Sequence, residues 1–315
     1  MLALDDSWVW DSWYVEDAGQ VHAFYLAAPR ELGDPDRRHT SARIGHSVSR
    51  DLINWTTLPD ALAPGATGDF DDLAVWTGSI VRRENEWHLF FTGIGSVAGP
   101  AVQRVGHAVS TDLVSWQRVT RGPIATADDR WYATAGAFES PDEPWRDPWV
   151  LQTADGIWHM LLTAAHRRDV DPVGGTIAHC VSPDLDTWRV DAPLTTRAAF
   201  RQLEVTQVVR VDGRYVLVFC AAASDVLDER IEAVTGTYTA PADGELGPYH
   251  LERAEPIGPG GIYAGRVVND PAGRPVLLGF VDSGAVGGFA GVICDPISLG
   301  LTDRGTLQPL AGAAP

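Results

Sequence analysis

Apolar residues along this chain occur in pairs of short runs, and a tight polar turn separates the two members of each pair. The paired runs begin at Trp10, Trp76, Arg146, Glu204 and Tyr263. Apolar runs of this kind are typical of β-strands, and the Gly, Asn and Asp residues between them are typical of hairpin turns. The pattern therefore predicts five β-hairpins, whose starts lie roughly 55–70 residues apart.

A second element follows each of the first three hairpins. Segments 44–55, 105–116 and 177–188 share the order apolar, small, His, small, Val, Ser, x, Asp, Leu, x, x, Trp. The alternation before the Ser predicts a strand with one buried face, the Ser-x-Asp-Leu stretch predicts a turn, and the Trp begins an outer strand. Each period then holds about four strands, which is one propeller blade. We expect an all-β protein that forms a five-bladed β-propeller, as a single domain over residues 1–315.

The second element also places a histidine at one position of three blades, namely His46, His107 and His179. A catalytic histidine is needed once, whereas a packing role repeats with the blade. The sequence therefore favours a structural role for all three.

Net charge narrows the set of partners. The formal net charge is −18 at pH 7, which argues against nucleic acids and anionic membrane surfaces and suits a neutral small-molecule substrate.

Cys180, Cys220 and Cys294 lie in apolar contexts and are expected to be buried free thiols in a reducing compartment. The chain shows no secretory signal pattern and no membrane-spanning stretch, so a cytoplasmic location is expected. The oligomeric state is left open.

Three carboxylates open hairpins one, three and four, and they are the candidate catalytic residues. Asp11 lies among tryptophans, which offer flat apolar faces for sugar rings. Asp147 lies between Arg146, whose charge favours an ionised carboxylate, and Pro148, which places it at a strand start or edge. Glu204 is the first residue of an otherwise apolar strand. Because a radial repeat brings equivalent positions to one axis, we expect the three carboxylates to converge. The alternative for each is structural: a bonded strand start, a loop-closing Arg–Asp pair, or an exposed edge residue.

Other charged clusters are expected to lie in loops. Asp69, Asp71 and Asp72 precede the second hairpin, where they could bind substrate hydroxyls or calcium, although their spacing is not that of a calcium loop. Segment 34–38 is predicted to be an exposed excursion. The loops expected to shape the leaving-group side of a site are 30–43, 93–104, 128–143 and 166–175.

Several motifs resemble those of glycoside hydrolase families 32 and 68, which include invertases, inulinases and levansucrases. The sequence VWDSWYV at 9–15 resembles the family 68 nucleophile motif, and Arg146-Asp147-Pro148 resembles the Arg-Asp-Pro motif of both families. Segments 45–64, 76–79 and 262–264 are similar to the corresponding family 32 segments. The ordered set covers nearly the whole chain.

The resemblance implies a compact five-bladed propeller, without the C-terminal β-sandwich of family 32, and a site in its axial funnel. Asp11 is then the nucleophile, Asp147 the residue that stabilises the transition state, and Glu204 the acid/base. The implied reaction is retaining hydrolysis or transfer of a β-fructofuranoside, such as sucrose or a short fructan. It needs no cofactor and no metal. Substrate contacts are predicted from Trp10, Trp13, Trp76, Ser79, Arg146, Gln207 and Tyr263, while Trp149 is predicted to be structural.

Three alternative functions stay open at this point. A family 43-like inverting arabinofuranosidase or xylosidase shares the predicted fold, but its carboxylates lie farther apart. A sugar phosphorylase needs a basic phosphate pocket, and basic residues cluster only at 37–43 and 167–168. A non-catalytic sugar-binding propeller would keep binding after Asp11 is changed.

Overall fold

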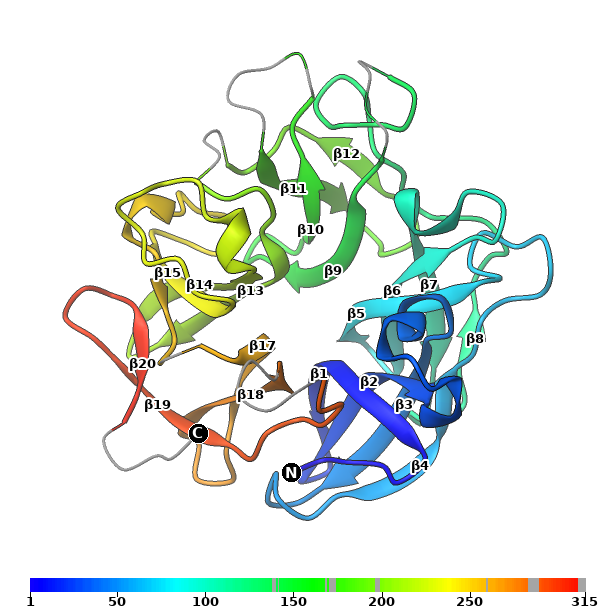
Figure 1. The fold of residues 1–315 in the computed structure, drawn as a ribbon, viewed down its shortest axis with the longest axis horizontal. Helices are drawn as coiled ribbons and strands as arrows, with labels where there is room; N and C mark the ends of the chain where they lie inside the picture. The colour runs from blue at the N-terminus through cyan, green and yellow to red at the C-terminus, as the bar shows by residue number, and fades with distance from the viewer. Residues whose placement is uncertain are drawn as a thin grey trace.

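The computed structural model describes residues 1–137, 140, 142–167, 169, 174–195, 199–258, 260–282 and 289–310. Five antiparallel four-stranded sheets surround a central axis (Figure 1), and each sheet contains four strands that are consecutive in the chain. The predicted all-β, five-bladed propeller is therefore confirmed. The helices in these residues are short 3-10 segments, and none has the length and apolar character needed to cross a bilayer.

The strands of each blade run in chain order from the axis outward. Blade 1 contains β1 (Ser7–Asp17), β2 (Gln20–Pro29), β3 (Arg43–Ser49) and β4 (Thr56–Leu62). Blade 2 contains β5 (Ala74–Arg83), β6 (Glu86–Ile94), β7 (Gln103–Ser110) and β8 (Gln117–Arg118). Blade 3 contains β9 (Trp145–Gln152), β10 (Trp158–Ala165), β11 (Gly175–Ser182) and β12 (Arg189–Asp191). Blade 4 contains β13 (Glu204–Val211), β14 (Arg214–Ala221), β15 (Gly236–Ala242) and β16 (Glu255–Pro256). Blade 5 contains β17 (Ile262–Asn269), β18 (Pro275–Val281), β19 (Ile297–Leu301) and β20 (Leu307–Pro309).

The 3-10 segments lie in the connections between strands. They are η1 (Arg30–Leu32), η2 (Pro35–Thr40), η3 (Gly99–Ala101), η4 (Ala223–Asp225) and η5 (Leu251–Arg253). Two of them, η1 and η2, lie between β2 and β3 and pack against blade 1 and β5. This connection therefore reaches from the first blade toward the second.

Every innermost strand contains a β-bulge at the same place. The pairing with the second strand shifts directly after Trp10, Trp76, Arg146, Glu204 and Tyr263. A bulge bends the strand and changes the direction of the side chains beside it. Each blade consequently offers two neighbouring positions at the axis. The residues before the shift are Trp10, Trp76, Arg146, Glu204 and Tyr263, and those at the shift are Asp11, Thr77, Asp147, Val205 and Ala264.

The bulges correct one detail of the sequence-based picture, in which the three carboxylates were expected at equivalent blade positions. Asp11 and Asp147 do occupy equivalent positions, within the bulge. Glu204 lies one residue earlier, and the hydrophobic Val205 takes the bulge position of blade 4. The alternation of apolar and polar residues does not reveal such a shift, because a bulge adds one residue to only one of two paired strands.

The Ser-x-Asp-Leu turns form as predicted. Ser49 Oγ accepts from the N–H groups of Asp51 (3.1 Å) and Leu52 (2.9 Å), and Asp51 Oδ1 accepts from the next two N–H groups. Trp55 Nε1 closes the turn by donating to the Leu52 carbonyl at 3.1 Å. The same Asp and Trp bonds recur in blades 2 and 3. Side-chain bonds thus satisfy the backbone donors where β3, β7 and β11 end.

The repeated histidines form buried or half-buried pairs with histidines of the neighbouring strand. His46, His107 and His179 lie 2.9, 3.0 and 2.9 Å, between ring nitrogens, from His22, His88 and His159. Burial, followed by the partner imidazole, lowers the pKa of His46 and His107 to about 3 and that of His179 to about 4. These neutral rings stack inside the blades, as the predicted structural role requires.

The N-terminal segment packs against the last blade and closes the ring. Leu2 pairs with Ile293, Val9 N–H donates to the Gly291 carbonyl at 3.0 Å, and the terminal amino group bonds Asp295. In Figure 1 the N-terminus accordingly lies between blades 1 and 5. β1 also contacts β17 and β18, so the first and last inner strands meet at the axis.

We expect Ser182→Ala to lower the free energy of unfolding by about 1–2 kcal/mol. Ser182 Oγ, which is buried, accepts from the N–H groups of Asp184 (3.2 Å) and Leu185 (2.8 Å), and both donors would lose their acceptor. Denaturant unfolding checks this value. Thr187→Ala is the matched control in the same turn, because its exposed side chain can change while its backbone N–H still bonds Asp184. Equal losses in the two variants would contradict the assignment.

Candidate active site

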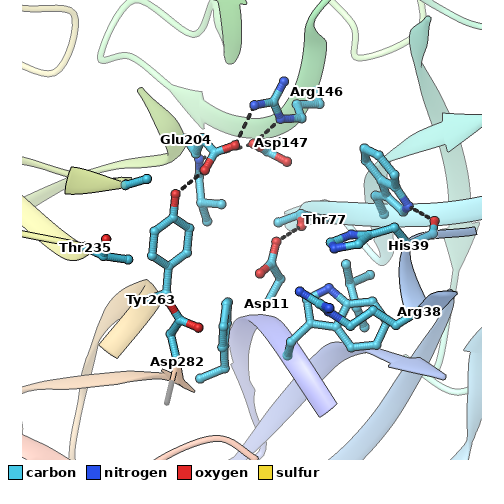
Figure 2. Close-up of a pocket in the computed structure, with 16 residues that line it drawn as sticks. Asp11, Arg38, His39, Thr77, Arg146, Asp147, Glu204, Thr235, Tyr263 and Asp282 are labelled. Carbon is cyan, nitrogen blue, oxygen red and sulfur yellow. Dashed lines mark hydrogen bonds and ion pairs between the residues drawn. The ribbon is translucent and has the colours of Figure 1, made fainter. Parts of the chain in front are cut away.

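A cavity of about 290 Å³ lies on the axis, between the inner strands of all five blades (Figure 2). Nine of its lining residues are the paired bulge positions of those strands. They are Trp10, Asp11, Trp76, Thr77, Arg146, Asp147, Glu204, Val205 and Tyr263. The others are Leu26, Arg38, His39, Ala222, Thr235, Phe280 and Asp282. The three carboxylates predicted to converge therefore line one cavity, and so do four of the predicted contacts, Trp10, Trp76, Arg146 and Tyr263.

Asp11 projects from the bulge of β1 into the cavity. The hydroxyl of Thr77, from the equivalent bulge of blade 2, donates to its Oδ2 (Figure 2). Burial, and then the negative charge of Asp147, raises the pKa of Asp11 to about 7. The Thr77 bond acts in the opposite direction, because it stabilises the ionised form. Asp11 thus changes charge near neutral pH.

Asp147 is held in place by several hydrogen bonds. Its Oδ2 accepts from the Thr163 hydroxyl at 2.8 Å and from the Val205 N–H at 3.3 Å. Its own N–H donates to Thr92 Oγ1 at 2.9 Å, and its φ of +58° places it in the left-handed region. Burial raises its pKa, while the charge of Arg146 opposes that rise. Because bonds on both sides hold Asp147 in this uncommon conformation, the direction of its carboxylate is fixed.

Glu204 lies between a cation and a phenol. Arg146 NH2 donates to its Oε1 at 2.6 Å, and the Tyr263 hydroxyl donates to its Oε2 (Figure 2). Arg146 Nε lies 3.5 Å from Asp147 Oδ2, so the guanidinium bridges the two carboxylates. Arg146 also donates hydrogen bonds to the side-chain oxygens of Gln103 and Gln202. The Arg-Asp-Pro segment therefore supplies both a carboxylate and the group that holds Glu204.

One side of the cavity comes from η2, between β2 and β3. The His39 carbonyl accepts from Trp76 Nε1 at 2.7 Å, and the His39 ring meets Trp10 and Trp76 edge to face. The Arg38 guanidinium packs over the Phe289 ring at 4.1 Å. Burial and the Arg38 charge lower the pKa of His39 to about 4, so its ring is neutral at neutral pH.

Arg38 and His39 were missed as site residues from the sequence. Loop 30–43 was expected to shape the site, but segment 34–38 within it was predicted to be an exposed excursion. This prediction is wrong for Arg38, which lines the cavity. Thr77 and Asp282 were also missed. Thr77 had a usable signal, because it occupies the same hairpin position as Asp11.

Three predicted contact residues lie away from the cavity. Trp13 is buried and stacks on Phe24. Ser79 Oγ accepts from Val150 N–H at 3.1 Å, and the Gln207 amide exchanges two 2.9 Å bonds with the Val267 backbone. Ser79 and Gln207 thus join neighbouring blades, and Trp13 packs within blade 1, instead of lining the cavity. They stand past the bulge, where the strand returns to its regular pairing.

The acidic residues before β5 are engaged in the loops. Asp69 bonds Arg121, Asp71 bonds Arg118, and Asp72 accepts from Ser96 and Gly68. Across the described part of the chain, no group of three His, Cys, Asp or Glu side chains is arranged to hold a metal ion. None of these three acids lines the cavity.

We expect the carboxyl group of Asp11 to titrate near pH 7 in a ¹³C NMR titration. Asp147→Asn should lower this pKa, because it removes a nearby negative charge, and Thr77→Val should raise it, because it removes a bond to the ionised form. Asp155→Asn, in an exposed hairpin turn, removes the same charge elsewhere and should leave the titration unchanged. A shift in the same direction for Asp147→Asn and Thr77→Val would contradict this account.

The profile of the glycosyl hydrolases family 32 N-terminal domain matches residues 13–287. The sucrose-6-phosphate hydrolase of Bacillus subtilis is 27% identical over 178 residues, which are 56% of this chain and 32% of that protein. The extracellular sucrase of Zymomonas mobilis is 26% identical over an alignment of 362 positions, which covers 97% of this chain and 82% of that protein. The first curated relatives are thus matched over about a third of their length.

Solved structures share the fold over the whole chain. The inulosucrase from Halalkalicoccus jeotgali bound to kestose superposes with a TM-score of 0.77 at 19% identity, covering 100% of this chain and 92% of that one. The Bombyx mori GH32 β-fructofuranosidase BmSUC1 gives 0.72 at 18% identity, covering 99% and 64%. The profile match includes Asp147 and Glu204 and begins two residues after Asp11. With most of its length matched by the profile, and with an axial cavity built from its inner strands, this chain belongs to the glycosyl hydrolase family 32 N-terminal domain family.

Proposed function

We propose that this protein is a retaining glycoside hydrolase or transglycosylase that acts on β-fructofuranosides. The observation that carries the proposal is the convergence of Asp11, Asp147 and Glu204, from three blades, in one cavity with aromatic walls. Membership of family 32 supports it, as do relatives named sucrase and β-fructofuranosidase. The inulosucrase with kestose and a BmSUC1 mutant with sucrose are neighbours in fold.

In the first step, the ionised carboxylate of Asp11 attacks the anomeric carbon of the fructosyl unit. The new bond to the Asp11 oxygen forms as the glycosidic carbon–oxygen bond breaks, and the leaving oxygen takes the proton of Glu204. Asp147 accepts hydrogen bonds from hydroxyl groups of the sugar, and these bonds tighten as positive charge develops on the ring. Trp10 and Trp76 form apolar walls that exclude water.

In the second step, Glu204 removes a proton from water or from a sugar hydroxyl. The oxygen of that acceptor bonds the anomeric carbon, and Asp11 leaves again as a carboxylate. Two displacements at one carbon give net retention of configuration. Water as acceptor gives hydrolysis, and a sugar gives transfer.

The two carboxylates depend on each other electrostatically. The negative charge of Glu204 contributes to the raised pKa of Asp11. A proton on Glu204 removes that repulsion and so favours ionisation of Asp11, which is the combination that the first step needs. Arg146 contacts both Asp147 and Glu204 and so links two of the three carboxylates.

We also propose that the fructoside is uncharged. Four acids line the cavity, Asp11, Asp147, Glu204 and Asp282, against two arginines. Arg146 is engaged by Glu204 and Asp147, and Arg38 is faced by the charges of Asp11, Asp36 and Asp282. A phosphate would meet an excess of like charge. Among the relatives, this favours the sucrase over the sucrose-6-phosphate hydrolase as the functional analogue.

The alternatives from the sequence have weaker support. The family 32 profile favours a fructoside over an arabinofuranoside or xyloside. A phosphorylase site conflicts with the acidic lining of the cavity. A non-catalytic binding role leaves three converging carboxylates without a function.

A cytoplasmic location is part of the proposal. Cys180, Cys220 and Cys294 are buried and unpaired, which suits a reducing compartment. Fractionation of the source cells, with activity assayed in each fraction, tests this point.

Asp11→Asn should reduce kcat on sucrose by at least ~10⁴-fold, because it removes the attacking carboxylate. Glu204→Gln should reduce it by ~10²–10⁴-fold, because the amide transfers no proton. NMR of products at early times should show the released fructose first as its β-furanose form. Asp282→Asn is the matched control in the same cavity and should keep most of kcat. Initial release of the inverted anomer would overturn the assignment of Asp11 as nucleophile.

The kcat/KM for sucrose should exceed that for sucrose 6-phosphate by at least ~10-fold, because like charges in a buried site cost several kcal/mol. Steady-state assays of both substrates give this ratio. Asp282→Asn should narrow it by removing one negative charge, whereas Asp60→Asn, on β4 and away from the cavity, should not. A preference for the phosphorylated sugar would refute the uncharged-substrate proposal.

A further inference from the structure

Arg266 is a buried cation behind the wall of the cavity. It lies on β17, two residues after the bulge position Ala264, and its side chain is 1% exposed. Burial of a charge is costly unless the group is bonded or faces opposite charge. Arg266 does not line the cavity, so it cannot contact the sugar directly. Its neighbours therefore indicate what it does.

The guanidinium joins three inner strands. Its NH1 donates to the carbonyls of Val205 (3.1 Å) and Thr206 (2.7 Å), the two residues that follow Glu204. The group also lies over the Trp149 ring at 5.0 Å, two residues beyond Asp147. Arg266 consequently holds the bulge that carries Glu204, and it packs beside the bulge that carries Asp147.

The peptide around Val205 is held from both sides. Its N–H donates to Asp147 Oδ2 at 3.3 Å, and its carbonyl accepts from Arg266. Val205 has a φ of +53°, a conformation that is strongly disfavoured for a β-branched residue. Such a conformation persists only where the surroundings enforce it. The two bonds supply that constraint, directly beside Glu204.

The charge of Arg266 also reaches the carboxylates. The groups that face it are Asp147 of β9, Asp11 and Tyr14 of β1, and Cys220 of β14. Its Nε and NH2 have no protein hydrogen-bond acceptor among the described residues. The positive charge of Arg266 is therefore not neutralised by a salt bridge within the described part of the chain. It favours the ionised form of Asp11 and so opposes the burial that raises the pKa of that residue.

We propose that Arg266 is a positioning residue that fixes the Glu204 bulge and supplies the buried positive charge behind Asp11 and Asp147. This inference rests on the proposed function, because positioning is defined by the reaction of those carboxylates. Two properties of one side chain are involved: the donors that hold Val205 and Thr206, and the charge that acts through space.

The test compares Arg266→Gln with Arg266→Lys in the full chain. Arg266→Gln removes the charge and should move the acid limb of kcat/KM on sucrose to higher pH, because the pKa of Asp11 rises. It should also lower kcat by ~10–100-fold with little change in KM, since a small misplacement of a catalytic group has an effect of this size. Arg266→Lys keeps the charge and should lower kcat while leaving the acid limb in place. Arg210→Gln, on β13, removes the same charge from an exposed position and should change neither.

A ¹³C titration of Asp11 in each variant, without substrate, separates this inference from the proposed function. Should the wild-type protein fail to cleave any fructoside, the proposed function falls, while the Asp11 titration still reports on Arg266. An unmoved Asp11 titration and acid limb in Arg266→Gln would overturn the inference and leave Arg266 a packing residue. If Arg266→Gln does not fold, Arg266→Lys decides alone: an unchanged kcat or a shifted acid limb would contradict the proposal.

Discussion

The β-bulge in each inner strand is the constraint on which the site depends. A regular strand alternates its side chains between two faces, so a propeller of regular strands would offer one side chain per blade at a given depth. The extra residue of the bulge brings two consecutive side chains toward the axis in each blade. Arg146 and Asp147 can then serve the same cavity although they are adjacent in sequence. Glu204 and Asp11 can likewise face each other from different bulge positions.

Because the bulges bring several charged side chains together at the axis, their charges must be balanced. Asp11, Asp147 and Glu204 share one small cavity with a fourth acid, Asp282, and the mutual repulsion of these carboxylates together with burial disfavours full ionisation. Two arginines offset this in different ways. Arg146 makes direct contacts and orients Glu204, whereas Arg266 stays behind the wall and binds backbone carbonyls. The hydroxyls of Thr77, Thr163 and Tyr263 complete the set of donors. Most of these donors come from a blade other than that of the carboxylate, so the site exists only in the closed ring.

The sequence predicted much of the fold because its signals are local. The hairpin turns, the Ser-x-Asp-Leu turns and the repeated histidines each depend on neighbouring residues or adjacent strands, and they fix the blade and its period. The three candidate catalytic acids could also be identified from the sequence, since an acid at the start of an apolar strand is unusual. Trp13, Ser79 and Gln207 were assigned to the cavity because they follow the same motifs, but they lie past the bulge. Arg38 and His39 were missed because a short polar connection gives no sign of which way it folds.

The sequence by itself determined the number of blades, the strands within them and the three acids that open the inner strands, because periodicity and turn chemistry are properties of short segments. Only the tertiary structure decided which side chains face the axis and how their charges are balanced. A bulge reverses the facing of the residues beside it, and contacts such as that of Arg266 with Val205 join residues about sixty positions apart. Such contacts depend on how the blades pack, which no local pattern in the sequence records.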